Sequence, residues 1–274
     1  MKFLSLLKQA PLSAQFGVLV ITLYLIVVIF APVLAPYGER EVLDSEYLPW
    51  GGEYLLGTDN LGRDMLSRLI YGARNTVGIA LVTTIIAFVG GGLLGLVAAI
   101  MGGWVDQLLS RAIDVVMAIP ALIFALLILT IVGTSTTSLI FVIAVLDSTR
   151  VFRLARSVAQ TVVVMDYVEA AKARGEGLWW IIRKEVLPNV SAPLIAEFGL
   201  RFCFVFLFIS ALSFLGLGIQ PPSADWGSMV RDNATLITFG DVTPLIPAAA
   251  IALLTVAINF VVDWALHRSS GLKD

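Results

Sequence analysis

The sequence predicts an all-helical integral membrane protein with six transmembrane helices. Hydrophobic residues make up 58% of the 274 residues and charged residues only 14%, and the mean hydropathy is +0.93. These values are far from those of soluble proteins. Polar segments separate apolar runs, several of which reach the roughly 20 residues that a helix needs to cross a bilayer. The net charge of −2 provides no basic surface for nucleic acid, so we expect membrane lipid and no nucleic acid as surroundings.

The apolar runs place the spans at residues 16–34, 77–101, 112–132, 136–146, 192–217 and 244–266. The first run is longer than the apolar part of a secretory signal, which has about 7 to 15 residues, and Pro32 and Pro36 mark its exit. We therefore expect it to be retained as a span. Pro120 should kink the third span, because proline cannot donate a backbone hydrogen bond.

The second span is rich in small residues, namely Gly90, Gly91, Gly92, Gly95, Ala98 and Ala99. Packing drives the association of helices in lipid, and small residues let two backbones approach each other closely. We therefore expect this side of the helix to be a contact seam.

Charged residues follow the fourth span and interrupt the fifth. Asp147, Arg150, Arg153 and Arg156 continue at helical spacing on a helix that should leave the bilayer, with its arginines at the cytoplasmic headgroups. Within the fifth span, Glu197 and Arg201 are four residues apart and share one helical face. Because ionisable groups are costly in lipid, these two either satisfy each other as an internal pair or line the substrate path.

Residues 35–74 form the first long polar segment, in which seven acidic residues outnumber four arginines, as is typical of the non-cytoplasmic side. The run Gly57-Thr58-Asp59-Asn60-Leu61-Gly62-Arg63-Asp64 is typical of a turn that leads into a short helix. The apolar side of that helix, with Met65, Leu66, Leu69 and Ile70, should lie on the membrane surface. We interpret the segment as an interfacial brace, with direct substrate contact as the alternative.

A second polar segment, residues 218–243, is predicted to be a loop on the same side. Pro221 and Pro222 should give it a rigid exit from the fifth span, and Trp226 suits the membrane interface.

A charged stretch from Asp166 to Asn189 lies between two apolar blocks. Asp166 can cap a helix in which Glu169 suits the positive end of the helix dipole, while Lys172 and Arg174 suit the negative end.

Gly175 and Gly177 should end this first helix, and a second short helix from Leu178 to about Leu187 should stop at Pro188. The predicted product is a helix, a tight turn and a helix, held between membrane spans. Such an element can press on a partner outside the bilayer and pass the force inward.

The distribution of basic residues predicts the orientation. With both termini in the cytoplasm, twelve basic residues lie inside and five outside, and Arg201 is within a span. The inner set is Lys2, Lys8, Arg111, Arg150, Arg153, Arg156, Lys172, Arg174, Arg183, Lys184, Arg268 and Lys273, and the outer set is Arg40, Arg63, Arg68, Arg74 and Arg231. This excess inside supports six spans and a charged stretch that faces the cytoplasm.

Catalysis by this chain is not expected. The sequence contains no phosphate-binding loop of the Gly-x-x-x-x-Gly-Lys-Ser/Thr kind, no Gly-x-Ser-x-Gly elbow and no His-Glu-x-x-His pair. Cys203 and His267 are the only residues of their types, which argues against a zinc site and a Cys/His catalytic pair. A membrane protein with no energy-capturing motif needs a partner that supplies energy, or else an intramembrane acid such as Glu197 for ion coupling.

The charged stretch resembles the "EAA" loop of ABC importer permeases. Glu169-Ala170-Ala171, Gly175 and Val186-Leu187-Pro188 carry this resemblance. Two further runs resemble the C-type permease subunit of the dipeptide, oligopeptide and nickel importer family. They are Gly57-Thr58-Asp59 with Gly62-Arg63-Asp64 and Ser67-Arg68, and residues 212–222 (Leu-Ser-Phe-Leu-Gly-Leu-Gly-Ile-Gln-Pro-Pro) with Asp225-Trp226-Gly227.

The resemblance implies a type I importer permease fold. Residues 1–74 would hold the additional N-terminal helix and a periplasmic segment, and residues 75–274 the five-helix core with the coupling loop at 157–190. Glu169, Ala170, Ala171 and Lys172 would lie at the ATPase, Gly175 would permit the turn, and Pro188 would complete the motif.

The same resemblance implies partners and a location. They are a second homologous permease, two ATP-binding subunits that carry ATP and magnesium, and a periplasmic or lipid-anchored solute-binding protein, in a bacterial or archaeal plasma membrane. Peptides are the expected solutes, while nickel, opines and oligosaccharides are alternatives within the family. A stand-alone ion-coupled carrier is the alternative from another class. This chain itself would hold no cofactor and no metal.

Overall fold

The structure, a computed structural model, describes residues 10–269. Three of the basic residues in the orientation count, Lys2, Lys8 and Lys273, lie outside the described residues, as does the side chain of Arg268.

The described chain is a bundle of long helices without strands, and two isolated β-bridges are its only extended pairings. Its helices are α2 (Leu12–Leu34), α3 (Met65–Met101), α4 (Gly103–Met117), α5 (Ala121–Val132), α6 (Thr136–Val163), α7 (Asp166–Ala173), α8 (Leu178–Ile181), the π-helix η1 (Ile182–Val186), α9 (Leu187–Phe214), α10 (Trp226–Asn233), the 3₁₀-helix η2 (Ala234–Phe239) and α11 (Leu245–Ser269). The all-helical fold class is therefore confirmed.

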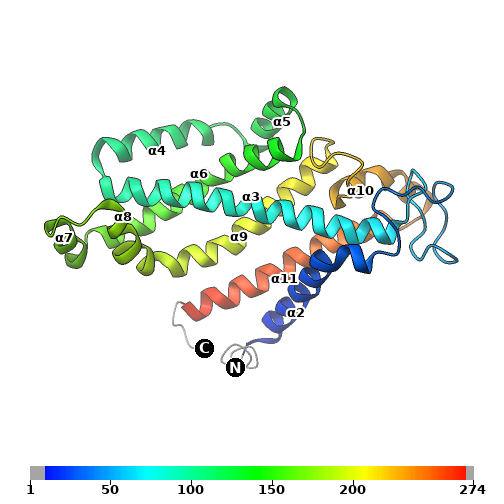
Figure 1. The fold of residues 1–274 in the computed structure, drawn as a ribbon, viewed down its shortest axis with the longest axis horizontal. Coiled ribbons are helices and arrows are strands. Elements are labelled where there is room, and N and C mark those ends of the chain that lie inside the picture. The colour runs from blue at the N-terminus through cyan, green and yellow to red at the C-terminus, as the bar shows by residue number, and fades with distance from the viewer. Residues whose placement is uncertain (1–9, 270–274) are drawn as a thin grey trace.

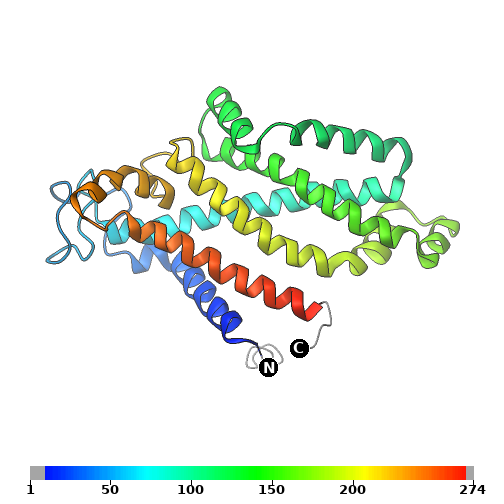
Figure 2. The ribbon, with the colours of Figure 1, turned by 180° about the vertical axis from the view of Figure 1, so that it is seen from behind.

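Four helical segments of the described chain are long and apolar enough to cross a membrane: α2, α3, the stretch from α8 through α9, and α11. The bent pair of α4 and α5 provides a fifth. Helix α6, whose 28 residues extend over about 42 Å alongside α3, is the candidate for the sixth predicted span. Helix α6 contains too many charged residues to be recognised as a membrane span from its composition alone. Figures 1 and 2 show the long helices running between one end with α7 and α8 and another with α10 and the 35–64 loop.

The small-residue seam of α3 packs against α6, as the sequence predicts. A Cβ atom added to Gly91 would lie 2.2 Å from the carbonyl oxygen of Ser148, and one on Gly95 would lie 2.7 Å from that of Phe152. Backbones this close require glycine at both positions. Gly90, by contrast, faces open space.

Helix α2 packs on α11 and α3, at the edge of the bundle (Figure 2). A Cβ on Gly17 would lie 2.5 Å from the carbonyl oxygen of Ala257, and the Tyr24 hydroxyl donates to the carbonyl of Ala250 at 3.0 Å. Most other α2 side chains are exposed apolar groups, which suits a helix that faces lipid.

The prediction of a separate surface helix after Asp64 is wrong. The Asp64 side chain caps α3, because its Oδ2 accepts a hydrogen bond from the Ser67 amide at 2.7 Å. The helix then runs unbroken to Met101, and Met65 is 1% exposed. The expected boundary between residues 74 and 75 therefore falls inside a helix.

The third span is also not the kinked helix that the sequence predicts. Two helices, α4 and α5, meet at 84°, and α4 begins at Gly103. Pro120 lies immediately before α5 and disfavours helical geometry in the preceding residue, which separates the two helices. We call this bend the α4–α5 elbow.

The outer segment after α9 is not simply a polar loop, since it contains α10 and η2. Trp226 is buried within the protein and is not exposed at its surface, where an interfacial tryptophan would lie. It is 2% exposed, and its ring meets Tyr24 and Phe206 edge to face, with centroid distances of 5.7 and 6.2 Å. Aromatic pairs favour this arrangement, and here it joins α2, α9 and α10.

Candidate coupling loop and translocation path

The charged stretch forms a tip at one end of the bundle, beyond the ends of α3 and α6 (Figure 1). Helix α7 ends in a tight turn in which the Glu176 amide donates to the Ala171 carbonyl at 3.2 Å and the Gly175 amide to the Lys172 carbonyl at 2.9 Å. Gly175 has φ +79°, as this glycine-terminated helix end requires. The predicted break at Gly175 is correct. Within the segment 157–190 of the predicted loop, we use the name coupling loop from here on for residues 166–186.

One side of α7 packs into the bundle. Val168 and Ala171 are fully buried in an apolar cluster with Leu96 of α3 and with Ile182 and Val186 of η1. Ala171 therefore makes internal contacts, and its side chain is not available to another subunit. The cluster joins α7 to α3 and to the start of α9.

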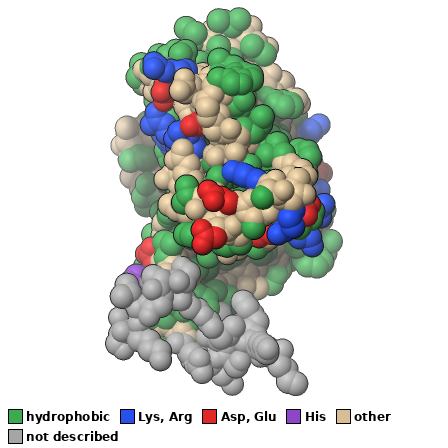
Figure 3. Space-filling view, turned by 90° about the vertical axis from the view of Figure 1, so that its left-hand side faces the viewer, with side chains coloured by type: hydrophobic (Ala, Val, Ile, Leu, Met, Phe, Trp, Pro, Cys, Tyr) green, Lys and Arg blue, Asp and Glu red, His purple; other side chains and the backbone are tan. Residues whose placement is uncertain are grey.

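The other side of α7 is exposed. Glu169, Ala170 and Lys172 all project away from the buried cluster. Figure 3 looks onto this end of the molecule and shows charged side chains gathered there. Three of the residues that the resemblance assigns to the ATPase contact, Glu169, Ala170 and Lys172, are therefore accessible to a partner.

Two details of the predicted loop are wrong. Met165 occupies the N-cap position of α7 without a capping hydrogen bond, and Asp166 is the first helical residue, where its charge still suits the helix dipole.

Pro188 also does not stop a short helix, because the chain continues from α8 through η1 into α9. Proline is tolerated in the first turn of a helix, where its missing N–H has no intrahelical partner, and the wider π turn before it accommodates the irregularity.

Glu197 and Arg201 form an ion pair in α9, with Glu197 Oε1 2.7 Å from Arg201 Nε. Arg201 Nη1 also lies 3.5 Å from Oδ1 of Asp147 in α6. The pair is thus internal and extends into a second helix. Its role in the translocation path remains a prediction.

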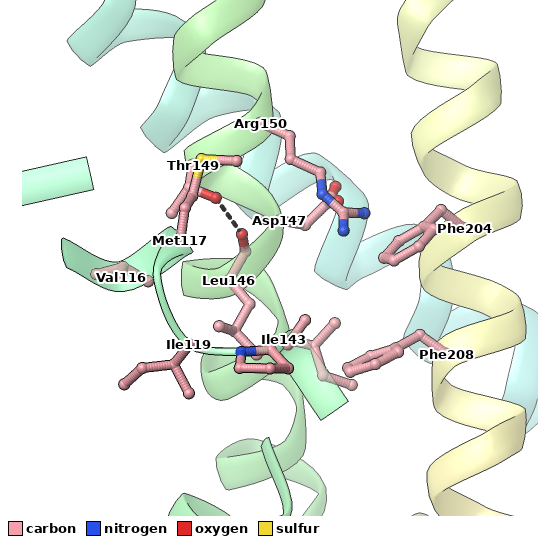
Figure 4. A pocket seen from close by; sticks show the side chains of 12 residues that line it. Val116, Met117, Ile119, Ile143, Leu146, Asp147, Thr149, Arg150, Phe204 and Phe208 are labelled. Carbon is pink, nitrogen blue, oxygen red and sulfur yellow. Dashed lines mark hydrogen bonds between the residues drawn. The ribbon is translucent and has the colours of Figure 1, made fainter. Parts of the chain in front are cut away.

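A cavity of about 210 Å³ lies next to this pair, between the α4–α5 elbow, α6 and α9 (Figure 4). Its lining residues are Val116, Met117, Ile119, Pro120, Ala121, Ile143, Leu146, Asp147, Thr149, Arg150, Phe204 and Phe208. We call it the elbow cavity.

The sequence did not predict this cavity, and the expected place of the α6 arginines at the cytoplasmic headgroups stays a prediction. Asp147 and Arg150, which line the cavity, are the twelfth and fifteenth of the 28 residues of α6, halfway along the helix. One feature of the sequence could have indicated that Asp147 lies within the bundle: it directly follows an apolar run. Further along α6, Arg153 pairs with Asp114 of α4 at 2.7 Å, and Arg156 pairs with Asp106 of α4.

The first outer motif is a buried polar network. Gly57 and Gly62 have φ values of +71° and +70°, and a Cβ on either would clash with a backbone oxygen. Thr58 donates to the Ser45 carbonyl at 2.8 Å. Asp59 binds Arg63 and Arg68 at 2.7 and 3.0 Å.

Asp59, Arg63 and Arg68 are each at most 5% exposed, so they hold the loop onto α3 and present little surface to a solute. This supports the interpretation as a brace.

The second outer motif is also structural. Asp225 caps α10 by accepting from the Ser228 amide at 2.8 Å and also accepts from the Thr76 hydroxyl of α3 at 2.8 Å. Burial raises the pKa of the Asp225 carboxyl, and the hydrogen bonds from Ser228 and Thr76 oppose that shift. Pro221 and Pro222 lie exposed before this cap.

The fold and these sites define a multi-pass membrane permease with an exposed helix-turn-helix tip at one end and charged residues halfway along two of its long helices. The sequence model described as "Binding-protein-dependent transport system inner membrane component" matches residues 91–270. The chain therefore belongs to this family of importer permeases.

Similar proteins include the dipeptide transport system permease protein DppC of Alkalihalophilus pseudofirmus, 35% identical over 95% of this chain and 84% of that protein. The di/tripeptide transport system permease protein DppC of Pseudomonas aeruginosa is 37% identical over 96% and 86%. A crystal structure of an amino acid ABC transporter has a TM-score of 0.56 at 20% identity and covers 74% of this chain and 94% of that one, which shows the fold.

Proposed function

We propose that this chain is the permease subunit of an ATP-driven importer of small peptides. The two relatives described above are named for dipeptide and di/tripeptide transport, and the chain covers most of the length of each. In the proposed complex it forms half of the translocation path, and a second homologous permease forms the other half. Two ATP-binding subunits, with ATP and magnesium, supply the energy, and an external binding protein delivers the peptide.

The observation that carries the coupling role is the two-sided construction of α7. Its exposed side, with Glu169, Ala170 and Lys172, is free to meet an ATP-binding subunit, while Val168 and Ala171 anchor it to α3 and η1. Closure of the ATP-binding subunits would move α7, and the anchored helices would tilt with it between inward-open and outward-open states.

This proposal sets the orientation in the plasma membrane. The coupling loop and both ends of the chain face the cytoplasm, and the outer motifs and Pro221–Pro222 face the binding protein. The basic residues Arg183 and Lys184, exposed on η1, suit the cytoplasmic side.

A charge reversal at Glu169 tests the coupling role. Glu169→Lys should reduce ATP-driven peptide uptake by proteoliposomes at least tenfold, because it places a cation where the ATP-binding subunit is expected to meet an acid. Co-purification with the ATP-binding subunits separates this contact from other causes of lost uptake: it should fall in Glu169→Lys and stay unchanged in the control Glu46→Lys, since Glu46 is also exposed but lies at the opposite end of the molecule. Wild-type uptake by Glu169→Lys would contradict the proposed contact.

A further inference from the structure

We propose that the elbow cavity binds the two charged ends of a zwitterionic peptide within the membrane, with Asp147 holding the ammonium group and Arg150 the carboxylate. This rests on the proposed function and adds a solute subsite to it. The proposal depends on one observation. A single cavity, halfway along α6, is lined by an acid with an unpaired oxygen and by a guanidinium that makes no hydrogen bond to a described residue (Figure 4).

Asp147 has a free acceptor. Its residue is 3% exposed, and within the described chain its Oδ2 atom has no hydrogen-bond partner. The other oxygen, Oδ1, is 3.5 Å from Arg201, a long contact for an ion pair. Buried carboxylate oxygens without donors are costly, so a ligand donor such as a primary ammonium would relieve this cost.

Arg150 has free donors. Its guanidinium carbon lies 4.0 Å from the ring centroid of Phe204, and its side chain makes no ion pair or hydrogen bond to any described residue. This contact holds the guanidinium beside the ring and leaves its N–H groups for a planar acceptor. A carboxylate fits these donors through two parallel hydrogen bonds.

The neighbouring Glu197–Arg201 pair contacts Asp147 through Arg201 Nη1. Arg201 is closer to Glu197, at 2.7 Å, than to Asp147, at 3.5 Å, so it only partly compensates the Asp147 charge. The two acids and two arginines together carry no net charge. A ligand with one positive and one negative end therefore leaves the group neutral, whereas a simple cation or anion would not.

The walls limit the size of the ligand. The elbow cavity holds about 210 Å³, below the roughly 300–1,000 Å³ of typical ligand pockets. Phe204, Phe208 and Ile119 supply an apolar wall, and apolar surroundings strengthen the attraction between opposite charges. Peptides of two small residues suit this space better than longer chains.

Binding to the assembled importer in nanodiscs, without the external binding protein, tests the proposal. The probe is radiolabelled dialanine, with competition by N-acetyl-dialanine, dialanine amide and sodium chloride. The variants are Asp147→Asn and Arg150→Gln. The controls are Asp114→Asn and Arg153→Gln, an ion pair that is 55% exposed at both side chains and lies outside the elbow cavity.

We expect wild-type and control complexes to bind dialanine, and both modified peptides to compete about tenfold less well, the effect of one lost charge-assisted hydrogen bond. Asp147→Asn should bind dialanine about tenfold more weakly and no longer distinguish it from N-acetyl-dialanine. Arg150→Gln should likewise no longer distinguish it from the amide.

Unchanged dialanine binding in both variants, equal competition by all three peptides, undetectable wild-type binding, or displacement by sodium ions alone would overturn the proposal. A monodisperse complex on size-exclusion chromatography shows that a variant has folded and assembled. ATP-driven uptake by the same preparations with the binding protein reports the proposed function separately. Wild-type uptake without Asp147-dependent binding rejects the subsite and keeps the permease, whereas wild-type complexes without uptake reject the permease function.

Discussion

At the residue scale, Gly90 and Gly91 are neighbours in α3 with opposite surroundings. Gly91 faces the α6 backbone, where an added Cβ would lie 2.2 Å from the Ser148 oxygen, whereas nothing lies within 4 Å of a Cβ on Gly90. The α3–α6 contact thus depends on one of two adjacent glycines.

Replacing each of these glycines with alanine separates helix propensity from packing. Gly91→Ala should destabilise the protein by about 1–3 kcal/mol, because α3 and α6 must move apart. Gly90→Ala should be neutral or more stable by up to about 1 kcal/mol, since alanine favours the helix. Thermal unfolding of the detergent-solubilised protein measures both. Equal unfolding temperatures for the two variants would contradict the close contact between α3 and α6 at Gly91.

The residue scale also shows what a sequence pattern leaves open. The seam of small residues predicted a close helix contact, and the structure has it. The run from Gly57 to Asp64 predicted a turn, but not that Asp59 would be buried between Arg63 and Arg68. That network depends on contacts brought together by the fold, which spacing along the chain does not encode.

At the element scale, the turn after α7 requires a left-handed backbone at one glycine only. Gly175 has φ +79°, while Gly177, two residues later, has φ −74°. No atom lies within 4 Å of a Cβ added at either glycine, so a packing clash does not distinguish the two positions and their backbone conformation does.

Alanine at these two positions tests the turn. Gly175→Ala should cost about 1–2 kcal/mol, because an L-residue is strained in the left-handed region, and it should lower ATP-driven uptake by tilting α7 on its buried cluster. Gly177→Ala, at the N-cap position of α8, should cost less than Gly175→Ala and leave uptake unchanged. Unfolding temperature and uptake are measured on the same preparations, and indistinguishable variants would show that the turn does not set the position of α7.

Prolines explain two of the differences between the predicted and observed elements. A rule that proline ends a helix predicted a stop at Pro188, where a π turn lets the helix continue. A rule that proline kinks a helix predicted a bend at Pro120, where the structure has a break of 84°. The neighbouring packing decides between a kink, a break and continuation, and the sequence alone does not contain that packing.

At the whole-molecule scale, the long helices separate two polar ends. The coupling loop lies at one end and the braced 35–64 loop at the other (Figure 1). Composition and charge distribution predicted two polar ends joined by apolar helices, because a bilayer requires apolar spans and biases the charges of the loops on its two sides. The elbow cavity was not predicted, since it combines α4, α5, α6 and α9.

Single cysteines at the two ends test the orientation. In intact cells a membrane-impermeant thiol reagent should label Glu46→Cys and leave Glu176→Cys unlabelled, and disrupting the membrane should expose the second. The native Cys203 is buried and gives little background. Labelling of Glu176→Cys from outside would reverse the proposed topology.

The most direct test of the central claim compares two adjacent alanines of α7. Ala170 is exposed and Ala171 is 0% exposed. In the assembled importer, a short bifunctional thiol reagent should cross-link Ala170→Cys to an ATP-binding subunit and leave Ala171→Cys unlinked. An intact complex in which Ala170→Cys forms no such cross-link would contradict the claim that this loop receives the force of ATP hydrolysis.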